Sequence, residues 1–473
     1  MAADKRSVFW IFVSVVCVVV VSAAVTEKLL HVPMFEVGSI WFRLTHLADD
    51  LNGNLFSRLS DISLLCATVY LASVIGGFFL LREAYRLFFV PLNRVRLQED
   101  VGYLPDGRFS NRDLANMVQK RRMVGEIPPV YPNGWFGLIE SHRLNKSEAI
   151  NIGLLGLNLA VFRDDNGEAH AIDAYCPHMG ANLAAGGRVV GDCLECPFHG
   201  WQFRGADGKC TKIPYTDSIP DIAKVKSWPV TELNGWIYLW HHAEGLDPTW
   251  KIPEIEEIQN GEWKFRGRSE HHINAHIEEI PENGADVYHL GQVHGPIMMA
   301  GIDLRFMYSK LWEFAKHEWT ACWEALPAPN AHIGQIKLTH SIKMFGKRLP
   351  PVDLSVDGQQ IGPGIVYLKF DNLLGKGAFL QSLTPEGPMM QRLVHNIYVH
   401  WKMPIIIAKF FMLGEALQVE RDIMIWNNKC YEAKPLFVKS KEDTLIARHR
   451  RWYQQFYSEN SPRFKFQKET LEW

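Results

Sequence analysis

Two short loops that each carry one cysteine and one histidine are the clearest chemical feature of this 473-residue sequence. Cys176-x-His178 is followed, after 17 intervening residues, by Cys196-x2-His199. A two-iron, two-sulfur cluster needs this donor set when one iron takes two thiolates and the other takes two neutral imidazoles. Because imidazole in place of thiolate raises the reduction potential, we expect these four residues to hold a mild electron relay.

A tetrahedral zinc site is the alternative use of two cysteines and two histidines. Zinc fingers normally place the two cysteines together and the two histidines together, whereas here each loop carries one of each, near a turn residue, Gly180 or Gly200. This arrangement favours the cluster. Cys193 and Cys210 are interpreted as buried apolar thiols and not as ligands.

Asp286, His289 and His294 form a second constellation. On a helix, Asp286 and His289 share a face, but His294 lies a further ~500° around the axis at ~100° per residue. An unbroken helix could not bring both imidazoles together, and Gly291 and Gly295 are placed to end it and fold His294 back. Two imidazoles and a carboxylate from elsewhere form the donor set that binds non-haem Fe(II) and leaves positions open for O₂.

Three more histidines, His271, His272 and His276, precede this constellation. Alternation along a strand places His272 and His276 on one face, where surface or pocket-lining roles are commoner than metal ligation. We therefore do not assign them as ligands, and a role in the wall of a pocket stays open.

The elements that must position these groups follow from the pattern of apolar runs and turns. Between Trp135 and His242, short apolar runs alternate with turn signals, which is typical of a small all-β domain. The expected strands there are Ala149–Leu155, Leu157–Phe162, Ala169–Ala174, Trp201–Phe203 and Trp236–Trp240. From about Trp250, helical stretches mix with alternating strands, which predicts an α+β domain. The expected helices are Glu282–Leu290 and Ala408–Lys429, and the expected strands are Val366–Phe370 and Arg392–Trp401.

Two uncharged apolar stretches, Val8–Val25 and Ile62–Leu81, contain 18 and 20 residues. Each is long enough for a bilayer core, which needs ~20 helical residues. Lysine and arginine gather at the outer ends of the pair, so we expect a transmembrane helical hairpin with both ends in the cytosol. The rival reading is a cleaved signal peptide, because Ser22-Ala23-Ala24 is a passable cleavage site. Further along, the apolar belt 403–413, interrupted by Lys409, is either a core helix or a lipid-facing entrance.

Composition narrows the class of protein. The chain is 47% hydrophobic and 22% charged, as a folded protein is. Fifty Lys and Arg against 52 Asp and Glu leave a net charge of −2, which argues against binding to nucleic acid. Of 8 cysteines, only Cys193 and Cys196 are close neighbours, so reduced thiols are expected. No Gly-x-Gly-x-x-Gly fingerprint follows an expected strand, so electrons from NAD(P)H would arrive through a separate reductase or ferredoxin-type donor.

The two constellations carry a resemblance to a known family. Cys176-x-His178-x17-Cys196-x2-His199 resembles the Rieske motif, and Asp286-x2-His289-x4-His294 resembles the iron site of Rieske non-haem iron oxygenases. The overall plan is similar to the animal cholesterol 7-desaturases of the Neverland type. From about residue 135 onward it is also similar to bacterial 3-ketosteroid 9-alpha-hydroxylases.

The resemblance implies further site residues. It makes Asp422 the carboxylate ligand of the mononuclear iron, with Glu420 as the fallback, although either acid could instead pair with Arg421 or Lys429 on a solvated face. It also implies that Asp286 links the cluster to the iron through hydrogen bonds. The simpler alternative is that Asp286 only orients His289. Family members often form trimers, so a homotrimer is expected.

The resemblance implies a complete assignment. We expect a membrane anchor at 1–90, a connector at 91–130, an all-β Rieske [2Fe-2S] domain at 131–245 and an α+β, helix-grip-like catalytic domain at 246–473. The expected oxidoreductase is a sterol desaturase of cholesterol metabolism and steroid biosynthesis that converts cholesterol to 7-dehydrocholesterol with O₂. Its expected location is the endoplasmic reticulum membrane, with the catalytic part in the cytosol. A sterol or steroid hydroxylase and a pure Rieske electron carrier are the alternatives.

Overall fold

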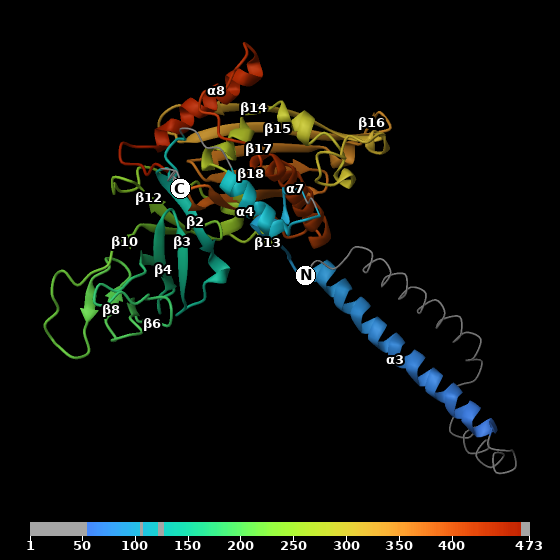
Figure 1. Cartoon of the computed structure of the whole chain (residues 1–473), viewed down its shortest axis with the longest axis horizontal. Helices are drawn as coiled ribbons and strands as arrows, with labels where there is room; N and C mark the ends of the chain where they lie inside the picture. Colours follow the sequence, from blue (N-terminus) through green and yellow to red (C-terminus); the bar gives the residue numbers. More distant parts are fainter. Residues whose placement is uncertain (1–53, 105–106, 122–126, 465–473) are drawn as a thin grey trace, which may run out of the picture. The chain divides into compact units, whose positions relative to one another are not determined.

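The computed structural model describes residues 54–104, 107–121 and 127–464 (Figure 1). Its contacts divide the chain into two units, Met1–Val90 and Pro91–Trp473. The described part of the first unit is one helix, α3 (Asn54–Phe89), which includes the apolar stretch Ile62–Leu81. Many apolar side chains of α3 are exposed, including those of Tyr70, Phe78 and Leu81.

The predicted membrane hairpin is tested only in part. Val8–Val25 lies outside the described residues. Among the residues that the structure describes, no helix combines the length and the apolar character needed to cross a bilayer.

The segment 91–130 contains regular structure that its sequence does not reveal. The strand β1 (Leu92–Arg96) pairs in parallel with β13 (Trp263–Asn274), and α4 (Asn111–Arg121) follows. Alternation in β1 is inverted, because Arg94 and Arg96 point inward and are half-buried while Val95 is exposed. A strand whose inward-facing residues are charged cannot be predicted from alternating hydrophobicity.

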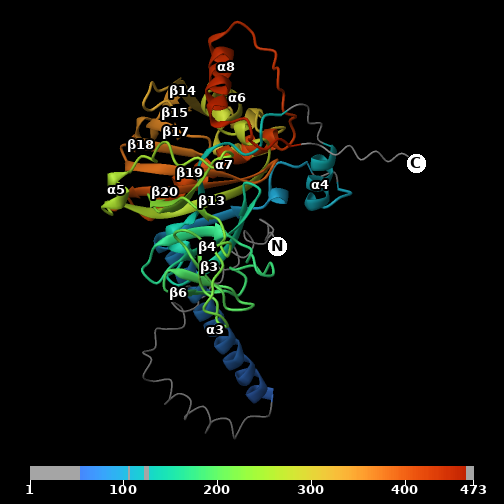
Figure 2. The same cartoon turned by 90° about the vertical axis from the view of Figure 1, so that its left-hand side faces the viewer.

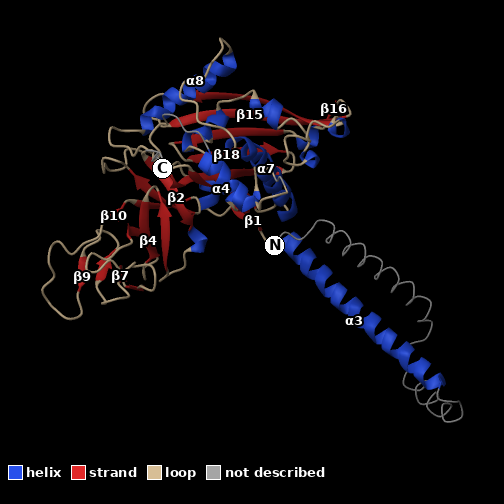
Figure 3. Ribbon diagram, in the orientation of Figure 1, coloured by secondary structure: helices blue, strands red, loops and turns tan. Residues whose placement is uncertain are grey.

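Three small sheets follow, and all of the predicted strands in this region are present to within a residue or two. The first sheet contains β3 (Ala149–Leu154), β4 (Leu157–Arg163), β5 (Ala169–Asp173) and β10 (Ser227–Trp228). The second contains β2 (Gly134–Glu140), β11 (Val230–Leu233) and β12 (Trp236–His241). The third contains β6 (Arg188–Val190), β7 (Cys193–Glu195), β8 (Gln202–Arg204) and β9 (Cys210–Lys212). Figure 3 shows this region built almost entirely of strands and loops.

A large sheet forms the other half of the second unit. Among the described residues it has nine strands, in the order β1-β13-β20-β19-β18-β17-β15-β14, with β16 paired to β15. Besides β1 and β13, these strands are β14 (Ala315–Ala325), β15 (Ile333–Met344), β16 (Lys347–Arg348), β17 (Leu354–Ile361), β18 (Ile365–Asn372), β19 (Gly375–Gly387) and β20 (Met390–His400). The mixture of this sheet with helices confirms the predicted α+β class. Its helices are α5 (Glu256–Gln259), α6 (His289–Val293), α7 (Ile405–Trp426) and α8 (Lys441–Tyr453).

The helix α7 is the central helix of this half and packs across β13 and β20 (Figure 2). It begins at Ile405 and ends at Trp426, so the predicted helix Ala408–Lys429 is confirmed with both ends displaced by three residues. Its buried apolar residues recur every three or four positions, which is the spacing of one helix face. They are Ile405, Ala408, Met412, Ala416, Val419, Ile423 and Trp426.

The predicted helix Glu282–Leu290 is wrong in its extent. The structure instead has two 3₁₀ turns, η3 (Ile277–Glu279) and η4 (Pro281–Gly284), and the short helix α6 starts only at His289. Asn283 and Gly284 have low helix propensities, so neither supports a continuous helix.

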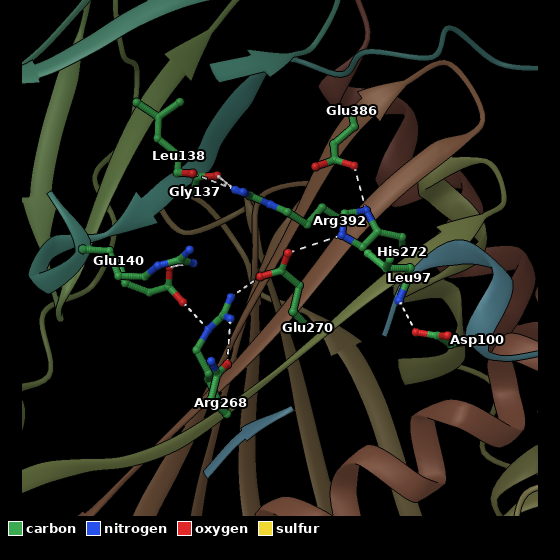
Figure 4. Close-up of polar contacts among 12 residues, drawn as sticks. Leu97, Asp100, Gly137, Leu138, Glu140, Arg268, Glu270, His272, Glu386 and Arg392 are labelled. Carbon is green, nitrogen blue, oxygen red and sulfur yellow. Dashed lines mark hydrogen bonds and ion pairs between the residues drawn. The ribbon is translucent and has the colours of Figure 1, made fainter. Parts of the chain in front are cut away.

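A chain of ion pairs joins β2 to the large sheet (Figure 4). Arg268 is buried and donates to Glu140 at 2.6 Å and also to Glu270. His272 lies 3.3 Å from Glu270 and 2.9 Å from Glu386. Nearby, Arg392 donates to the carbonyl oxygens of Gly137 at 3.3 Å and Leu138 at 2.6 Å. We call Glu140, Arg268, Glu270, His272 and Glu386 the junction network. It connects the small sheets to the half that contains the large sheet.

Candidate iron–sulfur and mononuclear metal sites

The two Cys/His loops are built alike. One follows β5 and the other lies between β7 and β8. In each, a glycine N–H donates back to the cysteine carbonyl, from Gly180 to Cys176 at 2.9 Å and from Gly200 to Cys196 at 3.1 Å. Both glycines have a positive φ, 74° and 70°, which a residue with a Cβ rarely adopts. The predicted turn roles of Gly180 and Gly200 are confirmed.

The four predicted cluster donors come together at the ends of these loops. Cys176 and Cys196 are buried, and the rings of His178 and His199 lie 4.7 Å apart. Trp201 stacks on His178 at 4.7 Å. Burial, reinforced by the neighbouring Cys196, raises the pKa of the Cys176 thiol to about 11. The four donors therefore lie close together.

These residues fit a [2Fe-2S] cluster with mixed ligation. The Nδ1 atom of His199 is buried and has no hydrogen-bond partner among the described residues. A buried polar atom without a partner is costly unless a ligand completes it. Cys193 and Cys210 are buried thiols outside this group, and Cys193 lies 3.3 Å from the Thr211 hydroxyl.

The second site brings together His289, His294 and Asp422. Each offers one ligand atom, and these atoms all lie within 4.8 Å of one another. His289 opens α6, and His294 follows its last residue with φ −104° and ψ 0°. The turn that ends α6 thus folds His294 back as predicted, and the two rings are 5.1 Å apart. Asp422 comes from α7, and its Oδ1 lies 3.2 Å from His294 Nε2.

The remaining ring nitrogens of both histidines face protein oxygens. His294 Nδ1 lies 2.8 Å from the side-chain oxygen of Gln418, and His289 Nδ1 contacts the main-chain oxygen of Asp286. Such contacts fix the tautomer of a metal-binding imidazole and direct the other nitrogen toward the metal. Burial alone would lower the pKa of His294, but Asp422 raises it overall. The three residues therefore supply two imidazoles and one carboxylate, the ligand set that fits a mononuclear Fe(II) site.

Gln418 was not singled out in the sequence. A usable signal existed, because Gln418 precedes Asp422 by four residues and so shares its face of α7.

The choice between the two predicted carboxylates is clear from their contacts. The buried Glu420 accepts from Arg94 at 2.6 Å and from Arg96 at 3.2 Å, and it lies 3.4 Å from His271. These contacts hold the Glu420 carboxylate away from His289 and His294. Among the described acids, Asp422 is the one that groups with both histidines.

The alternative in which either acid pairs with Arg421 on a solvated face is wrong. The Arg421 side chain is fully buried. It donates to four main-chain carbonyl oxygens, those of Val293 at 3.3 Å, Pro296 at 2.8 Å, Ile297 at 3.0 Å and Gly301 at 3.0 Å. Lys429 pairs instead with Glu279 at 3.1 Å.

A largely apolar pocket opens onto this second site. Most of its wall is apolar or aromatic, including Leu290, Trp319, Ala321, Ile336, Leu338, Val366, Leu368, Leu393, Val419 and Trp426. The polar residues Asn283, Gln360, Gln381, His395, Glu415 and Gln418 complete it together with the candidate ligands. Burial raises the pKa of Glu415 to about 7. His271, His272 and His276 do not line the pocket, so the open question of a pocket role is answered for the described structure.

Asp286 lies on the outer side of His289. Its side chain is 30% exposed, and its Oδ1 accepts from the His289 main-chain N–H at 3.2 Å. Together with Tyr288 and His289 it borders an open groove that Ser440 and Glu442 complete.

Comparison with known proteins gives one family match for the region of the cluster loops and another for the region of the mononuclear site. Residues 134–229 match the Rieske [2Fe-2S] domain, and residues 239–457 match the 3-ketosteroid 9alpha-hydroxylase C-terminal domain. A cholesterol 7-desaturase of Xenopus laevis is 52% identical over 384 residues, which cover 81% of this chain and 84% of the relative. One of Ciona intestinalis is 46% identical and covers 90% of each chain. The crystal structure of dicamba monooxygenase bound to 3,6-dichlorosalicylic acid has a TM-score of 0.52 at 18% identity and covers 70% of this chain and 98% of that one.

Proposed function

The chain belongs to the cholesterol 7-desaturase family of Rieske oxygenases, and from this premise we propose how its residues perform the reaction. The enzyme converts cholesterol to 7-dehydrocholesterol with O₂ and electrons from NAD(P)H. It uses a Rieske [2Fe-2S] cluster and a mononuclear non-haem iron. The cluster supplies electrons one at a time, and the iron supplies O₂ activation against a C–H bond.

We assign Cys176 and Cys196 as ligands of one cluster iron and His178 and His199 as ligands of the other. We assign His289, His294 and Asp422 as ligands of the mononuclear iron. The observation that carries this assignment is that the three ligand atoms lie within 4.8 Å of one another at the wall of an apolar pocket. The corresponding domains are 131–245 and 246–473.

The pocket's own residues bind and orient the substrate. Leu338, Leu368 and their apolar neighbours match the hydrocarbon skeleton of a sterol and exclude water from the reacting carbon. Gln418 and the main-chain oxygen of Asp286 hold the imidazoles in one tautomer.

We propose that Asp286 passes electrons between centres across a subunit boundary of a homotrimer. Its partial exposure and its contact with His289 place it where a neighbouring cluster could reach it. A separate reductase or ferredoxin-type protein would reduce that cluster.

We propose that the enzyme works on a membrane, at the endoplasmic reticulum, with the catalytic half facing the cytosol and the N-terminal 90 residues as the anchor. The exposed apolar side chains of α3 support an anchor, and the free cysteines of the described residues suit a reducing compartment.

In α7, Ile406, Phe410 and Leu413 form an exposed apolar stripe. Phe411 instead packs on Phe370, at 5.6 Å between rings. The apolar belt thus has a core side and an outer side.

The outer side of α7 is proposed as the face through which a sterol arrives. Phe410→Asp should lower turnover of cholesterol supplied in vesicles and spare turnover of cholesterol supplied in detergent. Leu436→Asp, another exposed apolar position, is the control. An equal loss with both modes of delivery would count against the entrance.

The desaturase assignment is tested by mass spectrometry of sterols from cells that express the chain and receive cholesterol. The expected product has lost two hydrogen atoms. A product that has gained one oxygen atom would identify a sterol hydroxylase. Two irons per chain without O₂ uptake would identify an electron carrier, because the oxygenase binds three.

A further inference from the structure

The pocket contains a cluster of three polar side chains beside a mostly apolar wall. Gln381 on β19 and His395 on β20 are direct cross-strand partners. The Nε2 atom of His395 lies 2.9 Å from the Gln381 side-chain oxygen and 3.6 Å from a carboxylate oxygen of Glu415 on α7. All three residues line the pocket. We call them the polar corner.

The polar corner is not satisfied by the protein alone. His395 is 1% exposed, and its Nδ1 atom has no hydrogen-bond partner among the described residues. Glu415 also makes no hydrogen bond within the described structure. Its distance to His395 is longer than a hydrogen bond. Polar groups in an apolar cavity are costly unless something completes their hydrogen bonds, so the corner is suited to a polar group of the substrate.

We propose that Gln381, His395 and Glu415 bind the 3-hydroxyl group of the sterol and thereby set which carbon faces the iron. This inference rests on the proposed function and names a subsite within it. A hydroxyl group both donates and accepts hydrogen bonds, so it can bond to a carboxyl, an amide and an imidazole group at the same time. The rest of a sterol is hydrocarbon, and most of the remaining pocket wall is apolar.

The spacing along α7 agrees with this placement. Glu415 precedes Asp422 by seven residues, which is two turns of the same face and a rise of about 10.5 Å. In a sterol, the 3-hydroxyl oxygen and C7 lie on adjoining rings, about 6 Å apart with C–C bonds of about 1.5 Å. The rise along α7 is longer than the distance from the hydroxyl oxygen to C7, so a sterol whose hydroxyl group contacts Glu415 can have C7 on the side of Asp422.

The test compares cholesterol with its 3-deoxy analogue, both delivered in the same detergent to the full-length enzyme with its reductase. The wild-type enzyme should prefer cholesterol in kcat/KM by about 10- to 100-fold, the range expected for hydrogen bonds to buried polar or charged groups. Glu415→Met and Gln381→Met should bring that ratio to within about threefold by raising KM for cholesterol, with turnover of the analogue kept. Leu338→Met, an apolar change in the same wall, should leave the ratio as in wild type.

Glu415→Met should still fold, because it removes a partly exposed carboxyl that has no hydrogen bond of its own among the described residues. The visible absorption of the cluster and the iron content verify this, and Glu415→Gln, which keeps hydrogen-bonding capacity, should retain part of the preference. Equal loss with both substrates would make Glu415 a support for the iron ligands and overturn the proposal. So would a wild-type enzyme that does not distinguish the two sterols.

Failure of the proposed function gives a different result. If the wild-type enzyme yields no product from cholesterol, the desaturase assignment fails, yet binding of the two sterols can still be compared through the fluorescence of Trp319 and Trp426, which line the pocket. Tighter binding of cholesterol than of the 3-deoxy analogue, abolished by Glu415→Met, would support the polar corner. Equal binding would overturn it.

Discussion

The Arg421 guanidinium donates a 2.8 Å hydrogen bond to the main-chain oxygen of Pro296. Pro296 follows the candidate ligand His294 by two residues, and Arg421 directly precedes the candidate ligand Asp422. The same guanidinium also reaches the carbonyl oxygen of Gly301 at 3.0 Å. One buried side chain therefore ties the segment that contains a histidine ligand to the helix that contains the carboxylate ligand.

Replacement of Arg421 by Met should release this segment. Four buried carbonyl oxygens lose their donor, and each unsatisfied group costs about 1–3 kcal/mol. We expect a lower melting temperature and an iron content that falls from three to two per chain, with the cluster absorption kept. Arg448→Met, at an exposed position, is the control. Full iron content in Arg421→Met would contradict the role assigned to this residue.

Substitution of Asp422 should mainly remove iron, whereas substitution of Glu420 should mainly lower stability. Asp422→Asn removes a candidate ligand, so mononuclear iron and turnover should be lost with little change in melting temperature. Glu420→Gln leaves Arg94 and Arg96 without their buried partner, so stability should fall by about 3–5 kcal/mol. Most of the iron should remain in Glu420→Gln. The reverse pattern would make Glu420 the ligand.

Gln418→Leu should weaken iron binding without removing a ligand. The substitution leaves His294 Nδ1 without its 2.8 Å partner, and loss of such a contact lowers metal affinity or activity by about 10- to 100-fold. Fe(II) titration of metal-depleted protein measures the change. The exposed Gln454 offers a matched Gln→Leu control, and equal affinities in the two variants would speak against the contact.

Asp286→Asn should slow electron transfer between the two iron sites without changing their metal content. Asp286 is a predicted link and not a ligand, so both metal contents should be normal. Oxidation of the reduced cluster in a single turnover with cholesterol and O₂ should slow by about 10- to 100-fold. An unchanged rate would leave Asp286 only the task of orienting His289.

The junction network should make stability depend on pH. Hydrogen bonds to Glu270 and then to Glu386 raise the pKa of His272 to about 9, above the ordinary value of ~6.5. The folded protein therefore keeps a proton that the unfolded chain releases, and raising the pH favours unfolding. The stabilisation is complete below pH ~6.5 and disappears as pH rises through about 9.

His272→Gln tests this dependence by thermal unfolding between pH 6 and 10. The variant should melt at a lower temperature than wild type at pH 6, and the difference should shrink steadily toward pH 10. His142→Gln, at an exposed position, should follow the wild-type profile. A difference that grows with pH would contradict the assigned protonation.

The cluster loops could be predicted from the sequence because their information is local. Each loop is a tight turn with its own cysteine, histidine and glycine, so the spacing alone defines the geometry. The turn that returns His294 to His289 was foreseen for the same reason, since Gly291 and Gly295 lie within the segment itself. The extent of the helix before it was not, because apolar spacing does not register the low helix propensity of Asn283 and Gly284.

The residues that support the iron site were missed because their partners are distant in the chain. Arg421 looks like a surface residue until its helix is packed against the segment after His294. Glu420 and Asp422 are two residues apart in the sequence, and their tertiary contacts distinguish them, because Glu420 pairs with the arginines of β1 whereas Asp422 groups with His289 and His294. Buried charges of this kind follow tertiary contacts and not hydrophobic periodicity.

The parallel pairing of β1 with β13 determines where the chain can be shortened. A truncation that starts after Arg96 would strip both arginines from Glu420 and leave a bare carboxylate inside the protein, two residues from Asp422. A version that starts at Pro91 keeps the whole strand. Soluble expression should therefore begin at that proline, even though the matched Rieske domain begins only at residue 134.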